Sequence, residues 1–319
     1  MTWQPSAPIS HLASRAKLNR LIRDFFARRA VMEVETPLLC SSTATDPHLS
    51  SWQTKANGRD YFLQTSPEFC MKRLLAVGCG PIYQIGKAFR HEEQSRHHNP
   101  EFTMLEWYRP DWKLEELMDE VEALVLNAAS AFGHSWTPFP RRTYRQAFED
   151  AIGLNPHRAT REELLGLANA HINGDFGSLD LDGLLDLVSS HLVEPHLPKS
   201  GIFLTEFPAS KASLAQAGKG SDGTTVALRA ELYLGGVEIA NGYQELVDSA
   251  EQAVRFKADI RQRQDTGLSP VPYPSELVSA LQHGFPESAG VALGLDRLLM
   301  VLLNCERIQD ILSFPIDRA

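Results

Sequence analysis

The chain has 319 residues, of which 43% are hydrophobic and 22% are charged, and its formal net charge is −9 at pH 7. This mix is typical of a folded globular protein and excludes a disordered chain, a collagen and a coiled-coil rod. Proteins that mainly bind nucleic acid phosphates are normally basic, so the negative charge disfavours that class.

The cysteines and the N-terminal residues indicate the compartment. The four cysteines form no C-x-x-C pair and no metal-ligand spacing, so we expect reduced thiols. The first ten residues lack a basic stretch followed by an apolar one, and the longest aliphatic run, Leu298 to Leu303, is far too short to span a bilayer. These observations predict a cytoplasmic protein.

In chain order, the first predicted element is an amphipathic helix over residues 10–30, with one apolar stripe formed by Leu18, Leu21, Ile22, Phe25 and Phe26. We expect its arginines and lysines to form a solvated face. Further helices are predicted from Ser66-Pro67-Glu68 onward and over 113–132, since Ser and Pro suit a helix start. Strands are predicted over 31–35, 61–64, 81–90 and 101–108, and the alternation of the last one places on one face Phe102, Met104, Glu106 and Tyr108.

The second half of the chain mixes helical and extended patterns. Three helical patterns fall in roughly 140–200, where we expect no catalytic chemistry, and strands follow over 201–207, 225–234 and 236–245. A helix over 250–265 and a rigid loop over 271–274 precede a strand that runs into a buried helix over 290–303. Strands and helices without strict βαβ alternation predict an α+β fold with a mostly antiparallel sheet flanked by helices. Rossmann and P-loop phosphate-binding motifs do not occur in the sequence.

Two segments carry arginines suited to phosphate binding. Arg90 ends one strand, and the returning strand 101–108 brings an aromatic ring and acids beside it, an arrangement that can clamp a nucleotide. Arg297 lies in the first turn of an apolar helix, where a helix N-terminus attracts anions. The alternatives are a surface ion pair of Arg90 with Glu92, and a buried ion pair of Arg297 with Asp296.

A third segment, over residues 231–245, is rich in acids. Glu231 and Glu238 flank a Gly-Gly break, and the strand period places Asn241, Tyr243 and Glu245 on one face. Acids clustered on strands are costly to bury unless they meet a cation, and Mg²⁺ takes one or two carboxylates together with phosphate oxygens. The acids could instead hold the ammonium group of a ligand. The alternative interpretation is that they form an exposed acidic face of the sheet and bind no ligand.

Taken in chain order, these three segments (89–108, 231–245 and 290–303) resemble the signature motifs of class II aminoacyl-tRNA synthetases. The helix over 10–30 with the strand ending at Pro37 is similar to motif 1, Phe89 to Tyr108 to motif 2, and Gly290 to Leu303 to motif 3. The strings H-N-P-E-F-T-M-L-E-W-Y and G-G-V-E-I-A-N-G-Y-Q-E are typical of the lysine branch. The resemblance covers almost the whole chain and implies a single class II catalytic domain over residues 1–319, with a helical insertion over roughly 140–200.

The resemblance also implies roles for individual residues. ATP with Mg²⁺ would be the nucleotide, with Arg90 on the α-phosphate, Arg297 on the γ-phosphate and Phe102 stacked on adenine. Arg90 and Arg297 would be the catalytic residues. The other nucleotide contacts would come from Glu92, His98, Asn99 and Glu231, and the metal ligands would be Glu231 and Glu238. The amino acid pocket would be built from Ser66, Glu68, Glu106, Tyr108, Asn241, Tyr243, Glu245 and Ala292, and its negative charge suits a substrate with two amino groups.

The chain departs from full lysyl-tRNA synthetases because the motif 1 resemblance starts within the first fifteen residues, which leaves no N-terminal anticodon-binding OB domain in this sequence. It is therefore similar to the freestanding elongation factor P–(R)-β-lysine ligases. That family adenylates (R)-β-lysine and, less well, α-lysine, and transfers it to a lysine of elongation factor P. The resemblance implies a homodimer through motif 1, no tRNA partner and no membrane partner.

Two residues bear on the choice between the lysines. Ser66 stands where lysyl-tRNA synthetases typically have Ala, and Ala292 stands where they have Gly. One methyl group in a tight pocket gives ~1–3 kcal/mol of discrimination, so we expect Ala292 to disfavour α-lysine and Ser66 to help seat the amino group of β-lysine. The alternatives are an enzyme that charges tRNA with lysine, a small-molecule amide synthetase and an inactive regulatory paralogue.

Overall fold

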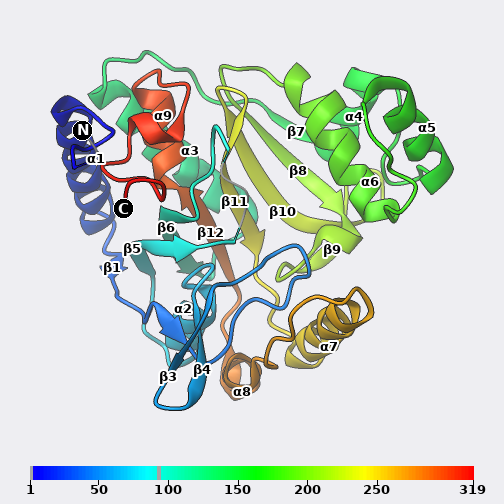
Figure 1. Ribbon diagram of the computed structural model, residues 1–319, viewed down its shortest axis with the longest axis horizontal. Helices are drawn as coiled ribbons and strands as arrows, with labels where there is room; N and C mark the ends of the chain where they lie inside the picture. Colours follow the sequence, from blue (N-terminus) through cyan, green and yellow to red (C-terminus); the bar gives the residue numbers. More distant parts are fainter. Residues whose placement is uncertain (1–2, 92–94) are drawn as a thin grey trace. The chain divides into compact units, whose positions relative to one another are not determined.

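The computed structural model describes residues 3–91 and 95–319. The chain divides into two compact units, of which the first comprises Met1–Trp136 with Glu245–Ala319 and the second comprises Thr137–Gln244 (Figure 1). Each unit has its own strands and helices. The prediction of one catalytic domain over residues 1–319 stays a prediction.

The first unit is built on four strands. These are, in spatial order, β1 (Met32–Glu33), β5 (Ile82–Phe89), β6 (Glu101–Pro110) and β12 (Ser288–Gly294). The β5–β6 and β6–β12 pairs are antiparallel and the β1–β5 pair is parallel. The register places Gln84, Glu106 and Ala292 directly across from one another. Because directly opposed residues share a face, Ala292 lies on the same side of the sheet as Glu106.

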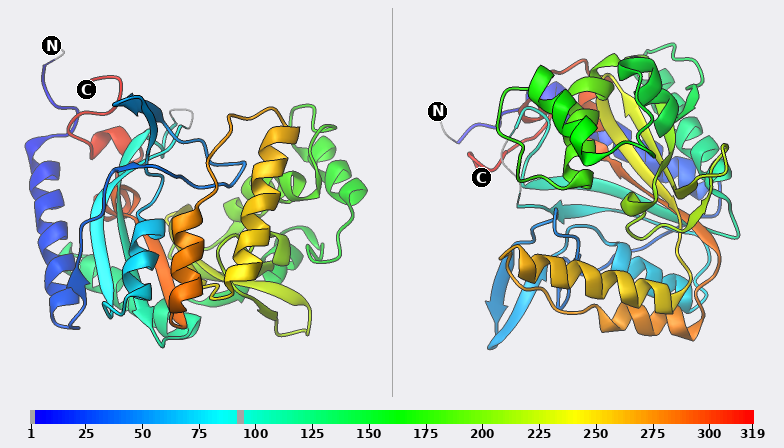
Figure 2. Two further views of the ribbon diagram at one scale, coloured as in Figure 1. Left: turned by 90° about the horizontal axis from the view of Figure 1, so that it is seen from below. Right: turned by 90° about the vertical axis from the view of Figure 1, so that its right-hand side faces the viewer.

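Helices lie on both sides of these strands (Figure 2). One group contains α1 (Ile9–Ala27), which contacts both α3 (Leu114–Ala131) and α9 (Leu295–Leu302). The other contains α2 (Glu68–Ala76), which packs on α8 (Ser275–Gly284), and α7 (Ser249–Asp265), which contacts α8 as well. A small antiparallel sheet of β2 (Leu39–Cys40), β4 (Arg59–Leu63) and β3 (Gln53–Ala56) completes the unit.

The apolar stripe predicted for the first helix is the part of α1 that enters the core. Leu18, Ile22, Phe25 and Phe26 are all buried, and the Phe26 ring stacks on Tyr83 at 4.4 Å between centroids. Burying a side chain of this size stabilises the fold by ~1.5–3 kcal/mol. The prediction of a solvated cationic face was wrong in part, because Arg15 pairs with the buried Asp296 and Arg29 lies 3.5 Å from Glu120.

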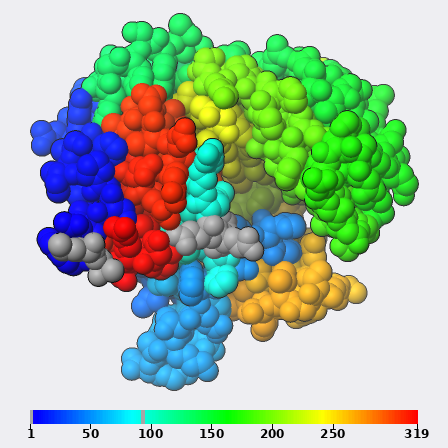
Figure 3. Space-filling view, turned by 45° about the horizontal axis from the view of Figure 1, so that its top comes forward, coloured from blue at the N-terminus to red at the C-terminus, as the bar shows by residue number. Residues whose placement is uncertain are grey.

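The first and last segments of the first unit lie side by side. The backbone N–H of Ser6 donates to the carbonyl of Ser313 at 2.8 Å, and that of Ala7 donates to Leu312 at 3.1 Å. Figure 3 shows the N-terminal helix in blue next to the C-terminal segment in red. Among residues 3–91 and 95–319, no helix is both long and apolar enough to cross a membrane.

The second unit has its own strands and its own core. The strands run in the order β11 (Val237–Gln244), β10 (Thr225–Leu234), β8 (Ile202–Pro208) and β7 (Arg141–Thr143), and β9 (Ala217–Lys219) pairs with β10. The three helical patterns expected in this region are α4 (Tyr144–Ile152), α5 (Arg161–His171) and α6 (Leu181–Val188). Thr143, Thr160 and Asp180 cap these helices through their side chains.

The strands pair mainly in antiparallel fashion, with β1–β5 and β7–β8 as parallel pairs. The predicted α+β class with a mostly antiparallel sheet flanked by helices is therefore confirmed. Helix α8 and the short strands β2, β3, β7 and β9 were missed. The predicted loop over 271–274 is present and leads directly into α8.

Candidate active site

Arg90 follows β5, and the β5–β6 hairpin brings it to Phe102. The backbone N–H of Arg90 donates to the carbonyl of Pro100 at 3.0 Å, and its guanidinium carbon lies 5.3 Å from the centre of the Phe102 ring. The Arg90 Nε is buried and has no hydrogen-bond partner among the described residues. Burying such a donor without an acceptor is costly, and a phosphate oxygen is an acceptor that suits it. The predicted partner Glu92 lies outside the described residues.

Arg297 projects from the first turn of α9 and lies beside His98. Its Nη2 is 2.5 Å from His98 Nε2, and His98 Nδ1 lies 2.7 Å from Ser95 Oγ. The alternative interpretation of Arg297, an ion pair with Asp296, was wrong. Asp296 pairs with Arg15 instead and accepts the backbone N–H of Thr103 at 2.7 Å.

Asn99, predicted to contact the nucleotide, is held by the chain itself. Its Nδ2 donates to the carbonyl of Glu101 at 2.6 Å, and its Oδ1 accepts the backbone N–H of Ile316 at 3.1 Å. Its side chain thus ties the 95–101 loop to the C-terminal segment, which orders the loop that carries His98.

Three carboxylates of the first unit, Glu68, Glu106 and Glu245, form what we call the carboxylate cluster. Ser66 Oγ donates to Glu106 Oε2 at 2.7 Å and accepts the backbone N–H of Glu68 at 3.0 Å. Tyr108 Oη donates to Glu106 Oε1 at 2.7 Å. The structure therefore brings together, in one unit, most of the residues predicted to bind the amino acid.

Burial and mutual repulsion perturb the cluster. Burial raises the pKa of Glu106 to about 7, and the charge of Glu68 adds to this effect. Burial likewise raises the pKa of Glu245 to about 8, with further contributions from Glu68 and Glu106. Carboxyls in this state gain most from a cation close by, because the cation relieves both effects.

Lys72, for which no role was predicted, lies inside the carboxylate cluster. Its side chain is fully buried, with Nζ 2.7 Å from Glu68 and 2.6 Å from Glu245. Burial alone would lower the pKa of Lys72, but Glu245 and Glu68 raise it above its ordinary value. The two carboxylate contacts therefore favour the charged form of the lysine. Lys72 lies four residues after Glu68 on α2, so the sequence could have predicted the contact between these two side chains. The contact with Glu245 could not be predicted, because Glu245 is distant in sequence.

Gly290 on β12 was also missed, although it lies against two predicted residues. A Cβ at this position would lie closer than 3.0 Å to Glu245 Oε1 and to Tyr108 Cε1, which real Cβ atoms essentially never do. Glycine is thus required for these two side chains to take their places.

The remaining predicted residues lie in the second unit, on the β10–β11 hairpin. Glu231 is directly opposite Asn241, and Tyr233 is opposite Glu238. Glu231 accepts the Tyr233 hydroxyl at 2.8 Å and pairs with Arg229, for which no role was predicted either. The guanidinium of Arg229 also lies 5.8 Å from the Tyr243 ring, and Asn241 Oδ1 is buried without a partner among the described residues.

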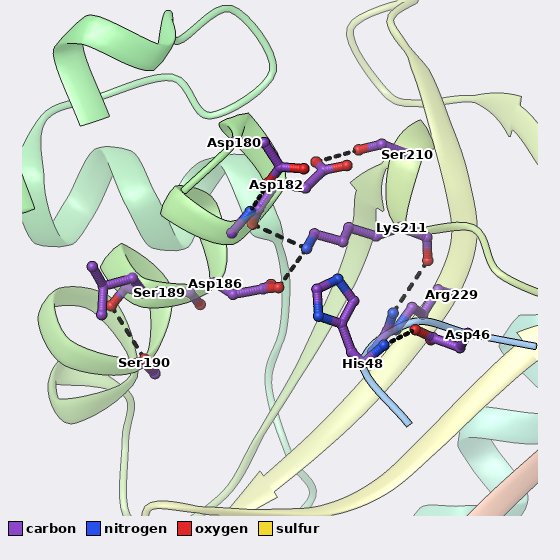
Figure 4. A network of polar contacts seen from close by, with 12 residues as sticks. Asp46, His48, Asp180, Asp182, Asp186, Ser189, Ser190, Ser210, Lys211 and Arg229 are labelled. Carbon is purple, nitrogen blue, oxygen red and sulfur yellow. Dashed lines mark hydrogen bonds and ion pairs between the residues drawn. The ribbon is translucent and has the colours of Figure 1, made fainter. Parts of the chain in front are cut away.

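Arg229 is itself anchored to a polar network (Figure 4). Its Nη1 donates to the carbonyl of Lys211 at 3.2 Å, and Lys211 Nζ contacts Asp186 at 2.6 Å. Ser210 donates to Asp182 at 2.7 Å on the same helix, α6. These contacts connect the helical region to the strand that carries Glu231.

The acids of this hairpin fit a divalent cation. Burial raises the pKa of Glu231, and Glu238 raises it further. Burial with the charges of Glu231 and Glu238 also raises the pKa of Glu194 to about 7, although no chemistry was predicted for that region. The described residues contain no group of three or more side chains arranged to hold a metal by themselves. Two carboxylates are nevertheless enough protein ligands for a Mg²⁺ site in which phosphate oxygens supply further ligands.

Comparison with known proteins assigns the chain to a family. Residues 5–318 match the family described as tRNA synthetases class II (D, K and N). The elongation factor P--(R)-beta-lysine ligase of Edwardsiella ictaluri is 45% identical over 334 residues, covering 100% of this chain and 98% of that protein. The enzymes of the same name from Yersinia enterocolitica and Enterobacter sp. are each 44% identical over 331 residues, with the same coverage. The chain therefore belongs to the class II tRNA synthetases of the D, K and N type and is an ATP-dependent ligase.

Proposed function

We propose that this enzyme adenylates (R)-β-lysine, and α-lysine less well, and transfers the β-lysyl group to the ε-amino group of a lysine of elongation factor P. The observation that carries the proposal is the carboxylate cluster with Ser66 and Tyr108 around it. Its raised pKa values indicate a demand for positive charge, which a substrate with two ammonium groups supplies. The names of the relatives supply the identity of the substrate and of the acceptor.

The chemistry needs no protein nucleophile. In the first step a carboxylate oxygen of the amino acid attacks the α-phosphorus of ATP, the bond to the β-phosphate oxygen breaks, and pyrophosphate leaves. In the second step the acceptor amine attacks the acyl carbon, an amide forms, and AMP leaves while the amine loses a proton. Positioning and charge stabilisation carry most of the catalysis of such phosphoryl chemistry.

In this proposal Arg90 holds the α-phosphate, and its buried Nε is a donor suited to that role. Arg297 and His98 contact the outer phosphates, Phe102 stacks on adenine, and Glu92 completes the nucleotide contacts. Asn99 supports them by holding the loop that carries His98. Glu231 and Glu238 would hold Mg²⁺, which would supply positive charge to the phosphates. Asn241 and Tyr243 are the other residues proposed to bind the amino acid.

The preference for β-lysine rests on Ala292 and Ser66. Ala292 lies opposite Glu106 on the neighbouring strand, so its methyl group occupies space on the face where Glu106 lies. The Ser66 hydroxyl bonds to Glu106 and to the backbone N–H of Glu68, and we propose that it also contacts an amino group of β-lysine. We propose that the methyl group disfavours the α-amino group of α-lysine.

We further propose a cytoplasmic homodimer formed through the motif 1 segment, with no tRNA partner. The support for dimerisation is that Met32, Leu38 and Leu39, which follow α1, are 41–48% exposed. Contiguous exposed apolar surface is typical of a site that a partner covers, and we propose that these side chains contribute to such a surface. We also propose a single class II catalytic domain over residues 1–319.

The test is to incubate the protein with ATP, (R)-β-lysine and elongation factor P and to measure the intact mass of the acceptor. We expect a gain of one lysyl residue, and none when the acceptor lysine is replaced. A parallel reaction offers tRNA and radiolabelled lysine. Charging of tRNA without modification of elongation factor P would contradict the proposal and favour a tRNA-charging enzyme.

A further inference from the structure

Lys72 is a cation that the chain itself supplies at the centre of a site proposed to bind cations. Its Nζ contacts Glu68 at 2.7 Å and Glu245 at 2.6 Å, and only 1% of the residue is exposed. Glu245 is likewise 1% exposed. Removing Lys72 would leave the buried Glu245 carboxylate and the partly buried Glu68 carboxylate without the cation that pairs with them.

The charges of the site balance only when Lys72 is counted. With all three carboxyls ionised, as a bound cation favours, the carboxylate cluster contributes three negative charges and Lys72 contributes one positive charge, which leaves two negative charges. The Lys72 ammonium pairs with Glu68 and Glu245, whereas Glu106 is held by two hydroxyl donors, Ser66 and Tyr108, and has no ammonium partner among the described residues. A diamino acid brings two ammonium groups, which matches the remaining charge.

We propose that Lys72 is a positioning residue for the amino acid, an inference that rests on the proposed function. By occupying the place between Glu68 and Glu245, Lys72 prevents the substrate ammonium from binding there. The ammonium is thereby kept on the outer side of the cluster, at the depth that brings the substrate carboxylate to the α-phosphorus. Lys72 contacts no reacting atom and acts through the two carboxylates.

The kinetic signature differs from that of a structural lysine. Without Lys72, two carboxylates become available to capture the substrate ammonium too deep in the site. Such capture binds the substrate but misplaces its carboxylate, and a misplacement of about 1 Å costs about 100-fold in rate. We therefore expect kcat for substrate activation to fall while KM for the diamino acid stays the same or falls.

The experiment measures ATP–pyrophosphate exchange with the diamino acid for the wild type, Lys72→Ala, Lys72→Arg and the control Arg73→Ala. Arg73 is the next residue on the same helix and is exposed. We expect Lys72→Ala to lose about 100-fold in kcat, and propylammonium added to the assay to restore much of it by filling the vacated cation position. The uncharged analogue propanol should not restore activity, and Arg73→Ala should match the wild type.

Several outcomes overturn the inference. A rise in KM with unchanged kcat, unchanged kinetics, or equal rescue by propanol and propylammonium each contradicts a role for the charge of Lys72. If Lys72→Ala does not accumulate as folded protein, Lys72→Arg carries the test, because it keeps the charge. If folded Lys72→Arg keeps kcat within about tenfold of the wild-type value, the inference is supported. If folded Lys72→Arg loses about 100-fold in kcat, the inference is overturned. Failure of the wild type with every diamino acid would instead refute the proposed function, and the inference with it.

Discussion

Replacing Gly290 by alanine tests whether Glu245 and Tyr108 work as the site requires. The added Cβ would lie closer than 3.0 Å to Glu245 Oε1 and to Tyr108 Cε1, whereas ordinary contacts are 3.4–4 Å. Both side chains must therefore move, and a displacement of about 1 Å at a substrate-binding group costs about 100-fold in rate. Overpacking of this kind also destabilises a protein by ~1–3 kcal/mol.

The assay is ATP–pyrophosphate exchange with (R)-β-lysine, accompanied by thermal unfolding of each protein. A matched control is Gly166→Ala, since Gly166 lies in helix α5 and a Cβ there meets nothing within 4 Å. Alanine in a helix is ~1 kcal/mol more favourable than glycine, so this control should keep full activity and equal or greater stability.

The expected result is a loss of about 100-fold in kcat/KM for Gly290→Ala in a protein that still unfolds cooperatively. Activity above half of the wild-type value would refute the reasoning, because Glu245 and Tyr108 would then not need their observed positions. Equal losses in both glycine variants would point to a general effect of the substitution instead.

Three further predictions concern the same site. Ala292→Gly should raise kcat/KM for α-lysine in pyrophosphate exchange by about 10-fold or more, and no gain would contradict the role of the methyl group. Because the pKa values of Glu106 and Glu245 are raised from 4.5 to about 7 and about 8, the folded protein holds protons that the unfolded chain has released. The unfolding free energy of the ligand-free protein should therefore fall as pH rises from about 5 to about 9. Each carboxyl contributes a fall of up to ~1.4 kcal/mol per pH unit between its unfolded and folded pKa, and Glu245→Gln should flatten this profile in thermal melts. Arg90→Ala should lower kcat by about 100-fold or more at unchanged melting temperature, and retained activity would exclude Arg90 from the α-phosphate.

Local patterns sufficed where the information was local. The stripe that includes Leu18, Ile22 and Phe26 predicted a helix and its buried face, because helical periodicity requires only neighbours in the chain. Strand alternation placed Glu106 and Tyr108 on one face, and the structure joins them by a hydrogen bond of 2.7 Å. The motif order also indicated the family, which the comparisons confirm.

Elements without a local signal were missed. Strand β3 has four exposed residues, so it shows no hydrophobic alternation. Helix α8 begins directly after a proline-rich loop. Its N-cap makes no side-chain hydrogen bond, so the sequence lacks a capping residue that would indicate the helix start. Its buried residues, Leu277, Val278 and Leu281, find their partner in α2, far earlier in the chain.

By itself the sequence determined most of the helices and strands, the α+β class, the family and the identity of the residues expected in the site. Only the tertiary structure decided the partners of the buried charges. Asp296 pairs with Arg15 rather than its neighbour Arg297, and Lys72 reaches Glu245, because contacts between residues this distant in sequence depend on how the sheet and helices pack. Ion pairs between residues distant in sequence produce no periodic pattern in the sequence. Because these charges are buried, their sum determines which ligand charge the site can bind.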